Sequence, residues 1–438
     1  MKRRAQELIL AVTAASWTGC APDDRRAAPE ADATEETHAF VGATILDGSG
    51  APPLADGVLL VRGGRIQEVG SADAVRVPAD AIVTDVTGRF IVPGLINAHG
   101  HVGGTLGLES GHYDRANLVR QLELYARYGV TTVVSLGGDG EEGVALREEQ
   151  ATESLARSRL FVAGAVVVGE TPGEAIEMVD GNAALGADFI KIRVDDNLGA
   201  TVKMTPEVYG AVIERAHDLG LPVASHLFYL EDAHGLLDAG VDFVVHSVRD
   251  RDVDPELAHK LIEHDVCYTP TLVREYVIYA YEEVPEFFSD PFFLAEADTA
   301  VLARLSDPEA MARVADDETA QRYKEALVQA QTNLGLLSEA GVTIAMGTDT
   351  GPPTRFQGYF EHVELELMKQ AGMSEMEILV ASTGDAARCT GRDDVGELSA
   401  GRWADFIVLE ADPLEDISNL RAIDGVWIAG NRIPALGS

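Results

Sequence analysis

The chain alternates between short apolar runs and longer stretches with helical periodicity over most of its length. Segments such as ANLVRQLELYARYG and PEVYGAVIERAHDLG have the helical pattern. The apolar runs predict eight strands: FIVPGLINAHGHV, VTTVVSLGG, LFVAGAVVV, ADFIKIRV, PVASHLF, VDFVVHSV, VCYTPTLV and VTIAMGTDTG. Eight strands joined by helical crossovers indicate an α/β protein, and specifically a (β/α)8 TIM barrel over residues 94–393.

Both ends of the chain show short strands and tight turns instead. GVLLVRGGRIQEVG predicts a hairpin across Gly63 and Gly64. Near the C-terminus, ADFIVLEAD and VWIAGNRI repeat the pattern, with a turn expected at Gly430 and Asn431. We therefore expect a small β-sandwich formed by residues 38–93 together with residues 394–438.

One connection is too long to be a plain loop. The segment around residues 274–340 separates the seventh strand from the eighth and begins REYVIYAYEEVPEFFSDPFFLAEAD, which is rich in Tyr and Phe. We expect it to form a helical insert above the mouth of the barrel. The insert is either one wall of the substrate site or a surface for packing and oligomer contacts, and the pattern favours neither.

The first twenty residues resemble a bacterial lipoprotein signal. KRR is followed by LILAVTAASW, too short to span a bilayer, and then by TGC. Cys20 would become the lipidated first residue, although Trp17 replaces the usual small aliphatic residue; ordinary secretion is the alternative. Residues 21–37 predict a disordered tether. The expected location is therefore the periplasm or outer membrane of a bacterium.

The composition narrows the range of partners. The 438 residues carry a formal charge of −38, which argues against nucleic acid or a polyanionic surface. The expected membrane contact is only the N-terminal lipid anchor, and a homo-oligomer remains open. Cys267 and Cys389 lie in apolar contexts and are interpreted as buried free thiols.

Two histidines end the first barrel strand. His99 and His101 are two positions apart, so in a strand both imidazoles point to the same face, as two ligands of one metal ion would. The alternative is a pair of half-buried structural histidines. Because catalytic residues of TIM barrels lie at the C-terminal ends of strands, the position favours a functional role.

The fourth strand contains a lysine in an apolar run. The alternation places Ile190 and Ile192 against the helices and turns Lys191 and Arg193 toward the interior. A buried lysine costs several kcal/mol unless it is paired. Carbamylation by carbon dioxide would convert it to a carboxylate that bridges two cations, and an ion pair with an internal carboxylate is the alternative.

Three more strands end in groups that could bind a metal. His226 ends the fifth strand, His246 the sixth and Asp349 the eighth. Each alone could be a polar core residue. Together they form a six-residue set at one predicted rim, and imidazole and carboxylate ligands suit zinc or another divalent metal. The full set is His99, His101, Lys191, His226, His246 and Asp349.

These motifs resemble the metal-dependent amidohydrolase superfamily, in its imidazolonepropionase-related and Xaa-Pro dipeptidase-like branch. The resemblance covers roughly residues 40–438, through PGLINAHGHV, GADFIKI, SHLF, VDFVVHS, GTDTG and GELSAGRWADFIVLEADPLEDI. It implies two divalent metal ions, zinc being expected, and a carbon dioxide-derived carbamate. The implied ligands are His99, His101 and Asp349 for the more buried ion, His226 and His246 for the second, and carbamylated Lys191 as the bridge. One departure is VHSVRD at the sixth strand, where many relatives have Glu-His-Gly.

The expected activity is hydrolysis of a C–N bond. A hydroxide shared by two metal ions would attack the carbonyl, and Asp349 would pass the proton to the leaving amine. The first candidate substrate is a dipeptide or an N-acyl amino acid. The alternative substrates are a cyclic amide, a lactone or a phosphotriester. An alternative function without catalysis is that of a lipoprotein that only binds a ligand.

Two residues are candidates for substrate contact. Arg193 could bind a substrate carboxylate, or could instead pair with Asp195 or Asp196. Tyr229 follows His226 closely and could stabilise an oxyanion. The rim candidates, each more typical of a structural role, are His112, Tyr268, Arg249, Arg274, Arg355 and Tyr359, while His362 is expected on a helix as a surface or packing residue.

Overall fold

The computed structural model describes residues 36–438. The predicted signal peptide, the lipidation site Cys20 and nearly all of the predicted tether lie outside the described residues. Among the helices that the structure describes, none is long and apolar enough to cross a membrane.

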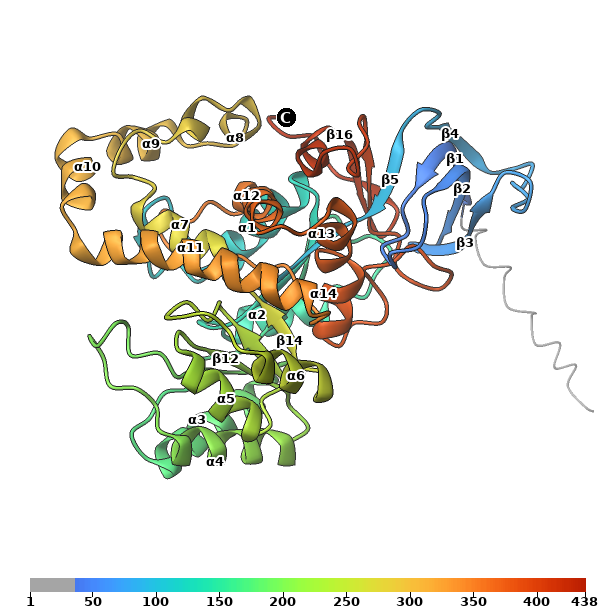
Figure 1. The fold of residues 1–438 in the computed structure, drawn as a ribbon. Coiled ribbons are helices and arrows are strands. Elements are labelled where there is room, and N and C mark those ends of the chain that lie inside the picture. Colours follow the sequence, from blue (N-terminus) through green and yellow to red (C-terminus); the bar gives the residue numbers. More distant parts are fainter. Residues whose placement is uncertain (1–35) are drawn as a thin grey trace, which may run out of the picture. The chain divides into compact units, whose positions relative to one another are not determined.

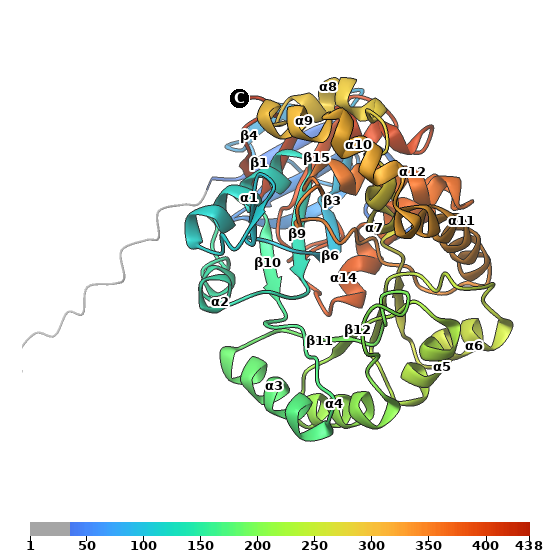
Figure 2. The same ribbon diagram turned by 90° about the vertical axis from the view of Figure 1, so that its left-hand side faces the viewer.

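Two parallel sheets lie in the middle of the chain, one with the order β10-β9-β6 and the other with the order β11-β12-β13-β14. The strands are β6 (Leu95–Gly100), β9 (Val130–Ser135), β10 (Arg159–Val162), β11 (Ile190–Arg193), β12 (Val223–His226), β13 (Phe243–Val245) and β14 (Cys267–Thr269). Figure 2 shows β6 and β9 to β12 inside, with α1 to α6 outside them. The architecture is TIM-barrel-like α/β, as the alternation of apolar and amphipathic segments predicts.

Some of the helices that follow these strands begin at a residue whose side chain caps the helix. Asp114 accepts a hydrogen bond from the backbone of Asn117 at the start of α1, and Thr171 and Glu174 form a capping box at α3. Their apolar faces pack on the strands. The crossover helices are α1 (Arg115–Arg127), α2 (Glu141–Glu148), α3 (Pro172–Leu185), α4 (Pro206–Asp218), α5 (Leu230–Asp238), α6 (Pro255–Glu263), α12 (Tyr359–Gln370), α13 (Glu375–Ala381) and α14 (Gly384–Cys389).

The prediction of a regular eighth strand is wrong. Residues 342–351 make single parallel bridges, from Ile344 to Tyr268 and from Thr350 to Gly100, but no continuous ladder. Asp349 has a φ of 58°, in the left-handed region, and this interrupts the extended backbone. The segment nevertheless lies beside β6, because the backbone of Ala98 donates to Met346 and that of His101 to Thr350.

Strands from both ends of the described chain share one eight-stranded sheet, in the order β17-β16-β15-β5-β1-β2-β3 with β4 on β1. Arg62 pairs with Arg65 across the predicted Gly63–Gly64 turn, which is confirmed. The second turn is shifted by one residue: Ile428 pairs with Asn431, so Ala429 and Gly430 form it. The strands are β1 (His38–Ile45), β2 (Leu54–Arg62), β3 (Arg65–Ser71), β4 (Ile82–Asp85), β5 (Phe90–Pro93), β15 (Phe406–Leu409), β16 (Ile423–Ile428) and β17 (Asn431–Arg432).

The long connection between β14 and residue 342 is helical, as predicted. Figure 1 shows α8, α9 and α10 as an arm that leads into the long helix α11, which runs beside α7. Its elements are α7 (Leu272–Tyr279), η1 (Glu286–Ser289), α8 (Pro291–Leu294), α9 (Thr299–Leu305), α10 (Pro308–Ala315) and α11 (Glu318–Glu339). The remaining short elements are β7 (Thr105–Leu106), β8 (Glu109–Ser110) and η2 (Ile417–Arg421).

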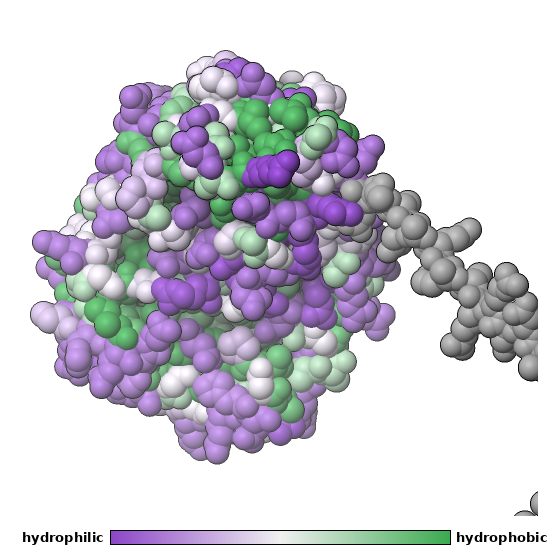
Figure 3. Space-filling model, turned by 90° about the vertical axis from the view of Figure 1, so that its right-hand side faces the viewer, coloured by the Kyte–Doolittle hydropathy of each residue, from purple (hydrophilic) through white to green (hydrophobic). Residues whose placement is uncertain are grey.

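The expectation of two free thiols is wrong. Cys267 at the start of β14 and Cys389 at the end of α14 form a disulfide across 122 positions of sequence. The apolar context of each cysteine gave no sign of the other, because only the fold brings the two segments together. Elsewhere the surface agrees with the composition: hydrophilic residues cover most of the face in Figure 3, with hydrophobic residues in smaller groups.

Candidate metal centre

His99, His101 and Asp349 form a cluster that could hold a metal ion. One ligand atom from each lies within 4.8 Å of the others. Nε2 of His101 is 2.8 Å from Oδ1 of Asp349, and Nε2 of His99 is 3.7 Å from the same oxygen. His99 and Asp349 are buried, and His101 is half-buried. The three residues come from the end of β6 and from the segment beside it.

Two glycines allow this close approach. A Cβ at Gly347 would lie 2.9 Å from the backbone nitrogen of His99, and one at Gly351 would lie 2.1 Å from the carbonyl oxygen of His101. Any side chain at either position would therefore push the segment of Asp349 away from β6. The glycines of GTDTG serve this contact.

Lys191 reaches the same centre from β11. Its Nζ lies 3.4 Å from Nε2 of His99, and its side chain is buried, as the alternation along the strand predicts. Burial lowers the pKa of Lys191 to about 7, against the opposing effect of Asp349. An amine with this pKa is about half neutral at pH 7, and the neutral form is the one that reacts with carbon dioxide.

His226 and His246 extend the centre on its other side. The ring centroids of His99 and His246 are 4.7 Å apart, and those of His246 and His226 are 4.0 Å apart. Burial lowers the pKa of His226 to about 3 and that of His246 well below its ordinary value. Both rings are therefore neutral at pH 7, as metal ligands must be.

Neighbouring groups fix the orientation of three of the rings. Nδ1 of His101 donates to the carbonyl of Gly137 at 2.9 Å, and Nε2 of His226 lies 2.8 Å from Oδ2 of Asp195. Nδ1 of His246 lies 2.6 Å from Oγ1 of Thr271. This leaves one nitrogen of each ring for another ligand, the arrangement usual for histidines that bind metals.

Two of these neighbours escaped the sequence reasoning. The sequence indicates Asp195 only as a partner for Arg193, although it continues the inward alternation of Lys191 and Arg193 at the end of β11. That alternation is a usable signal. Thr271 has a φ of 49° just after β14, and nothing in its local pattern distinguishes it.

Two of the rim candidates contact Asp349. The guanidinium of Arg355 forms an ion pair with Oδ2 of Asp349, and Nε of Arg274 lies 3.7 Å from the same oxygen. Burial would raise the pKa of Asp349, but Arg355 and the hydrogen bond from His101 hold it well below its usual range. Asp349 is thus a carboxylate. Arg274 is itself held by Glu275 at 2.6 Å.

The two predicted substrate residues lie beyond the histidines. Arg193 lines a cavity of about 800 Å³ together with Asp195 and Lys203, and its buried Nε has no hydrogen-bond partner among the described residues. The predicted alternative, an ion pair with Asp195 or Asp196, is not among the ion pairs of the described part of the chain. Tyr229 donates to Oδ1 of Asp196 at 2.8 Å.

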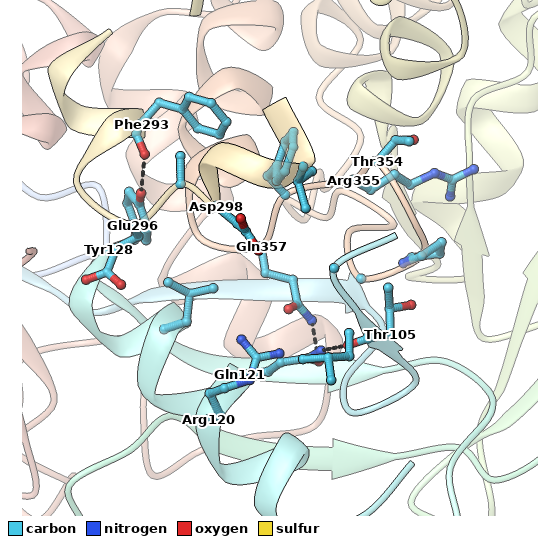
Figure 4. Close-up of a pocket in the computed structure, with 18 residues that line it drawn as sticks. Thr105, Arg120, Gln121, Tyr128, Phe293, Glu296, Asp298, Thr354, Arg355 and Gln357 are labelled. Carbon is cyan, nitrogen blue, oxygen red and sulfur yellow. Dashed lines mark hydrogen bonds between the residues drawn. The ribbon is translucent and has the colours of Figure 1, made fainter. Parts of the chain in front are cut away.

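A second, smaller cavity of about 170 Å³ lies beside the segment that follows Asp349. Figure 4 shows Gln357 reaching Gln121, which in turn donates to the carbonyl of Thr105 at 2.6 Å. Phe293 and other insert residues close its far side, and Arg355 lines it. The insert therefore forms a wall of this cavity.

Comparisons with known proteins agree on one family. The amidohydrolase family model matches residues 90–433. The imidazolonepropionase of Rhodococcus jostii is 24% identical over 402 residues, covering 86% of this chain and 88% of that protein. The structure of a putative prolidase from Bifidobacterium longum has a TM-score of 0.74 and 27% identity, covering 92% and 96% of the two chains. A Xaa-Pro dipeptidase structure with bound methionine has a TM-score of 0.74 and 22% identity, covering 91% and 100%.

The match spans most of the described residues, including all six predicted metal ligands. The candidate metal cluster agrees with the divalent metals that such enzymes typically use. The chain belongs to the amidohydrolase family and is a hydrolase that acts on carbon–nitrogen bonds.

Proposed function

We propose that this protein is a binuclear metal-dependent hydrolase that cleaves the amide bond of a dipeptide or an N-acyl amino acid. The observation that carries the proposal is the continuous series of contacts from Asp349 through His99 to Lys191, and through His246 to His226. Five nitrogen-bearing side chains and one carboxylate in one cluster suit two divalent cations, and we propose that both are zinc.

The proposed ligands fall into two groups. His99, His101 and Asp349 would hold one ion, and His226 and His246 the other. Lys191 would carry a carbamate between them, formed when its neutral amine attacks carbon dioxide and loses a proton. The buried position of Lys191 and its low pKa support this.

We propose the same fold as the sequence predicts. The bridges at Val167, Ile344 and Thr350 support a closed barrel around the centre, and the eight-stranded sheet supports the sandwich at the chain ends.

The protein's own residues would direct the reaction. Bound divalent ions would supply acidification of a water molecule and polarisation of the scissile carbonyl. Asp349, a carboxylate at neutral pH, would accept the proton of the attacking water and deliver it to the leaving nitrogen. The imidazoles of His226 and His246, whose pKa values burial lowers, would stay neutral at pH 7 and free to bind a metal ion.

The cavity beside Arg193 supports a substrate with a carboxylate. Arg193 has an unpaired buried Nε there, and a guanidinium pairs well with a carboxylate. Lys203, which lines this cavity, lies over the ring of Tyr229 at 4.9 Å, and Tyr229 would contact the substrate after release from Asp196. The likeness to structures of a putative prolidase and a Xaa-Pro dipeptidase agrees with a dipeptide.

A cyclic amide is the second candidate. The likeness to imidazolonepropionase extends over 402 residues and favours it. Lys191 argues against the activity of imidazolonepropionase itself, because a bridging carbamate has a role only if there are two metal ions, but a cyclic amide could also be hydrolysed by the same binuclear centre.

We further propose that the enzyme is exported and held at the membrane through a lipidated Cys20. The disulfide between Cys267 and Cys389 supports export, since disulfides persist in oxidising compartments.

Elemental analysis tests the centre, with Lys191→Ala beside wild type and the surface variant Lys260→Ala as the control. Within residues 36–438, Lys260 forms ion pairs only with Asp238 and Glu256, so its loss should leave the metal content unchanged. About two ions per chain, falling sharply only in Lys191→Ala, would support the proposal and justify screening dipeptides and N-acyl amino acids. One ion per chain, unaffected by either variant, would contradict it and direct the screen to cyclic amides.

A further inference from the structure

The backbone at Asp349 has an unfavourable conformation, which other interactions in the protein must stabilise. Asp349 has a φ of 58°, a conformation that costs free energy in a residue other than glycine. Its backbone nitrogen donates to the carbonyl of His99 at 2.6 Å, and Thr348 donates to the same carbonyl at 3.0 Å. These bonds tie Asp349 to β6, but they leave the side chains of Thr348 and Thr350 to be satisfied.

Those side chains converge on one buried carboxylate. Glu361, the third residue of α12, is fully buried. Its Oε1 accepts hydrogen bonds from Oγ1 of Thr348 at 2.8 Å, from Oγ1 of Thr350 at 2.6 Å and from Nδ2 of Asn97 at 2.7 Å. Its Oε2 accepts from the backbone of Gly358 at 2.6 Å. All four partners donate, so Glu361 acts purely as an acceptor.

Asn97 links Glu361 to the backbone of His99. Its Nδ2 donates to Glu361, while its Oδ1 accepts from the backbone nitrogen of His99 at 3.0 Å. One carboxylate therefore fixes the residues on both sides of Asp349 and, through Asn97, the backbone of His99. Asp349 and His99 are two of the three residues in the candidate metal cluster.

We infer that Glu361 is a positioning residue that sets the spacing of His99 and Asp349 for a metal ion. The inference rests on the proposed function, in which these two residues are ligands. In the described part of the chain, no hydrogen bond joins Glu361 to the side chain of either ligand, so it would act only through Asn97 and the two threonines. Groups that orient ligands in this way typically affect metal affinity by about 10- to 100-fold.

The competing explanation is a helix cap. Glu361 accepts from Gly358 at the start of α12, and a cap alone would need only that bond. Glu377 offers a matched control, because it occupies the same third position of α13 and caps Ser374 at the surface, at 2.7 Å. Glutamine at either position weakens a cap, but only at 361 does it confront three further donors.

The test compares Glu361→Gln with Glu377→Gln in the full-length protein, by zinc affinity in chelator competition and by the visible spectrum of the cobalt-loaded protein. We expect Glu361→Gln to weaken zinc binding by about 10- to 100-fold and to alter the cobalt spectrum. Glu377→Gln should stay within about twofold of wild type, because it only loosens a cap. Wild-type zinc affinity and spectrum in a folded Glu361→Gln protein would overturn the inference.

A second pair of variants covers the case in which Glu361→Gln does not fold. Thr348→Val removes the hydroxyl that donates to Glu361, and Thr348→Ser restores it. Weaker zinc binding in the valine variant, with near wild-type affinity in the serine variant, would support the inference; equal affinities would overturn it. A wild-type chain that takes up no zinc would overturn the proposed function as well, whereas unchanged affinity in all variants would overturn this inference alone.

Discussion

Nζ of Lys191 lies 3.4 Å from Nε2 of His99, and both residues are buried. An ammonium group at this distance would repel any cation bound by His99. A carbamate would attract it instead, so the contact suits a metal centre in which the lysine is modified. The prediction is that metal uptake depends on carbon dioxide.

Reconstitution of metal-free protein with zinc tests this dependence. In buffer with bicarbonate we expect about two ions per chain, and in carbon dioxide-free buffer about one or fewer. A carbamate carbon should appear in the NMR spectrum after labelling with 13C-bicarbonate. Lys191→Ala should take up the same amount of zinc in both buffers, and equal uptake by wild type in both would contradict a carbamate.

The burial of His362 predicts that the folded protein loses stability in weak acid. It lies buried on α12, where Nε2 donates to the carbonyl of Tyr128 at 2.8 Å, so it is a packing residue. Burial lowers its pKa to about 3. Between that value and about 6.5, the unfolded chain binds a proton at His362 that the native state does not, so stability falls as the pH falls.

His362→Gln keeps a donor for Tyr128 but cannot titrate. Between pH 7 and pH 5 we expect wild type to lose about 2 kcal/mol more than this variant, from the linkage of this one group. Urea unfolding at the two pH values measures the difference. His259→Gln serves as the control, because His259 is exposed on α6; identical pH dependence in wild type and His362→Gln would refute the assignment.

The ion pair between Arg159 and Asp405 joins β10 to the strands at the C-terminal end. Nε of Arg159 lies 2.6 Å from Asp405, which also accepts from the backbone of Ala429 at 2.7 Å. Both side chains are buried. Asp405→Asn would leave the guanidinium without a counter-charge, at a cost of about 3–5 kcal/mol, measurable by urea unfolding.

The exposed pair of Arg115 and Glu149 provides the comparison. Glu149→Gln should leave the unfolding midpoint close to that of wild type, because solvent screens this pair. A similar small effect from Asp405→Asn would mean that the buried arginine finds another partner.

The parallel strands and the inward direction of His99, His101 and Lys191 could be predicted from the sequence because both depend on local periodicity. His99 and His101 share a face of β6, and Lys191 points inward between Ile190 and Ile192, by the same period of two. The hairpin at Gly63 and Gly64 follows from local turn chemistry in the same way.

The features that escaped prediction depend on residues far apart in the chain. The disulfide of Cys267 and Cys389 and the network of Asn97 with Glu361 exist only once the strands are in place. The irregular eighth segment escaped for another reason: the backbone of Met346 donates to Ala381 and Asp349 has a φ of 58°, and neither departure changes the apolar pattern of the segment.

The disulfide should contribute strongly to stability. It closes a loop of 122 positions, for which the chain-entropy model gives about 5 kcal/mol. Replacing Cys267 and Cys389 with serine should lower the melting temperature, and a reductant should do the same to wild type. The serine variant should then be insensitive to reductant; a reductant effect of the same size in that variant would mean that it acts elsewhere.

Asp195 should control the binding of only one of the two proposed ions. Its Oδ2 accepts from Nε2 of His226 at 2.8 Å, which leaves Nδ1 of that ring for a metal ion. Asp195→Asn keeps the shape of the side chain but removes the charge that makes His226 a stronger ligand, so zinc affinity at one site should fall about 10- to 100-fold.

Asp196→Asn is the matched control, because Asp196 accepts from Tyr229 rather than from an imidazole. Chelator titration should remove one ion early from Asp195→Asn and neither early from Asp196→Asn. Parallel titration curves for the two variants would show that His226 holds no metal ion, and the second site would then have to be abandoned.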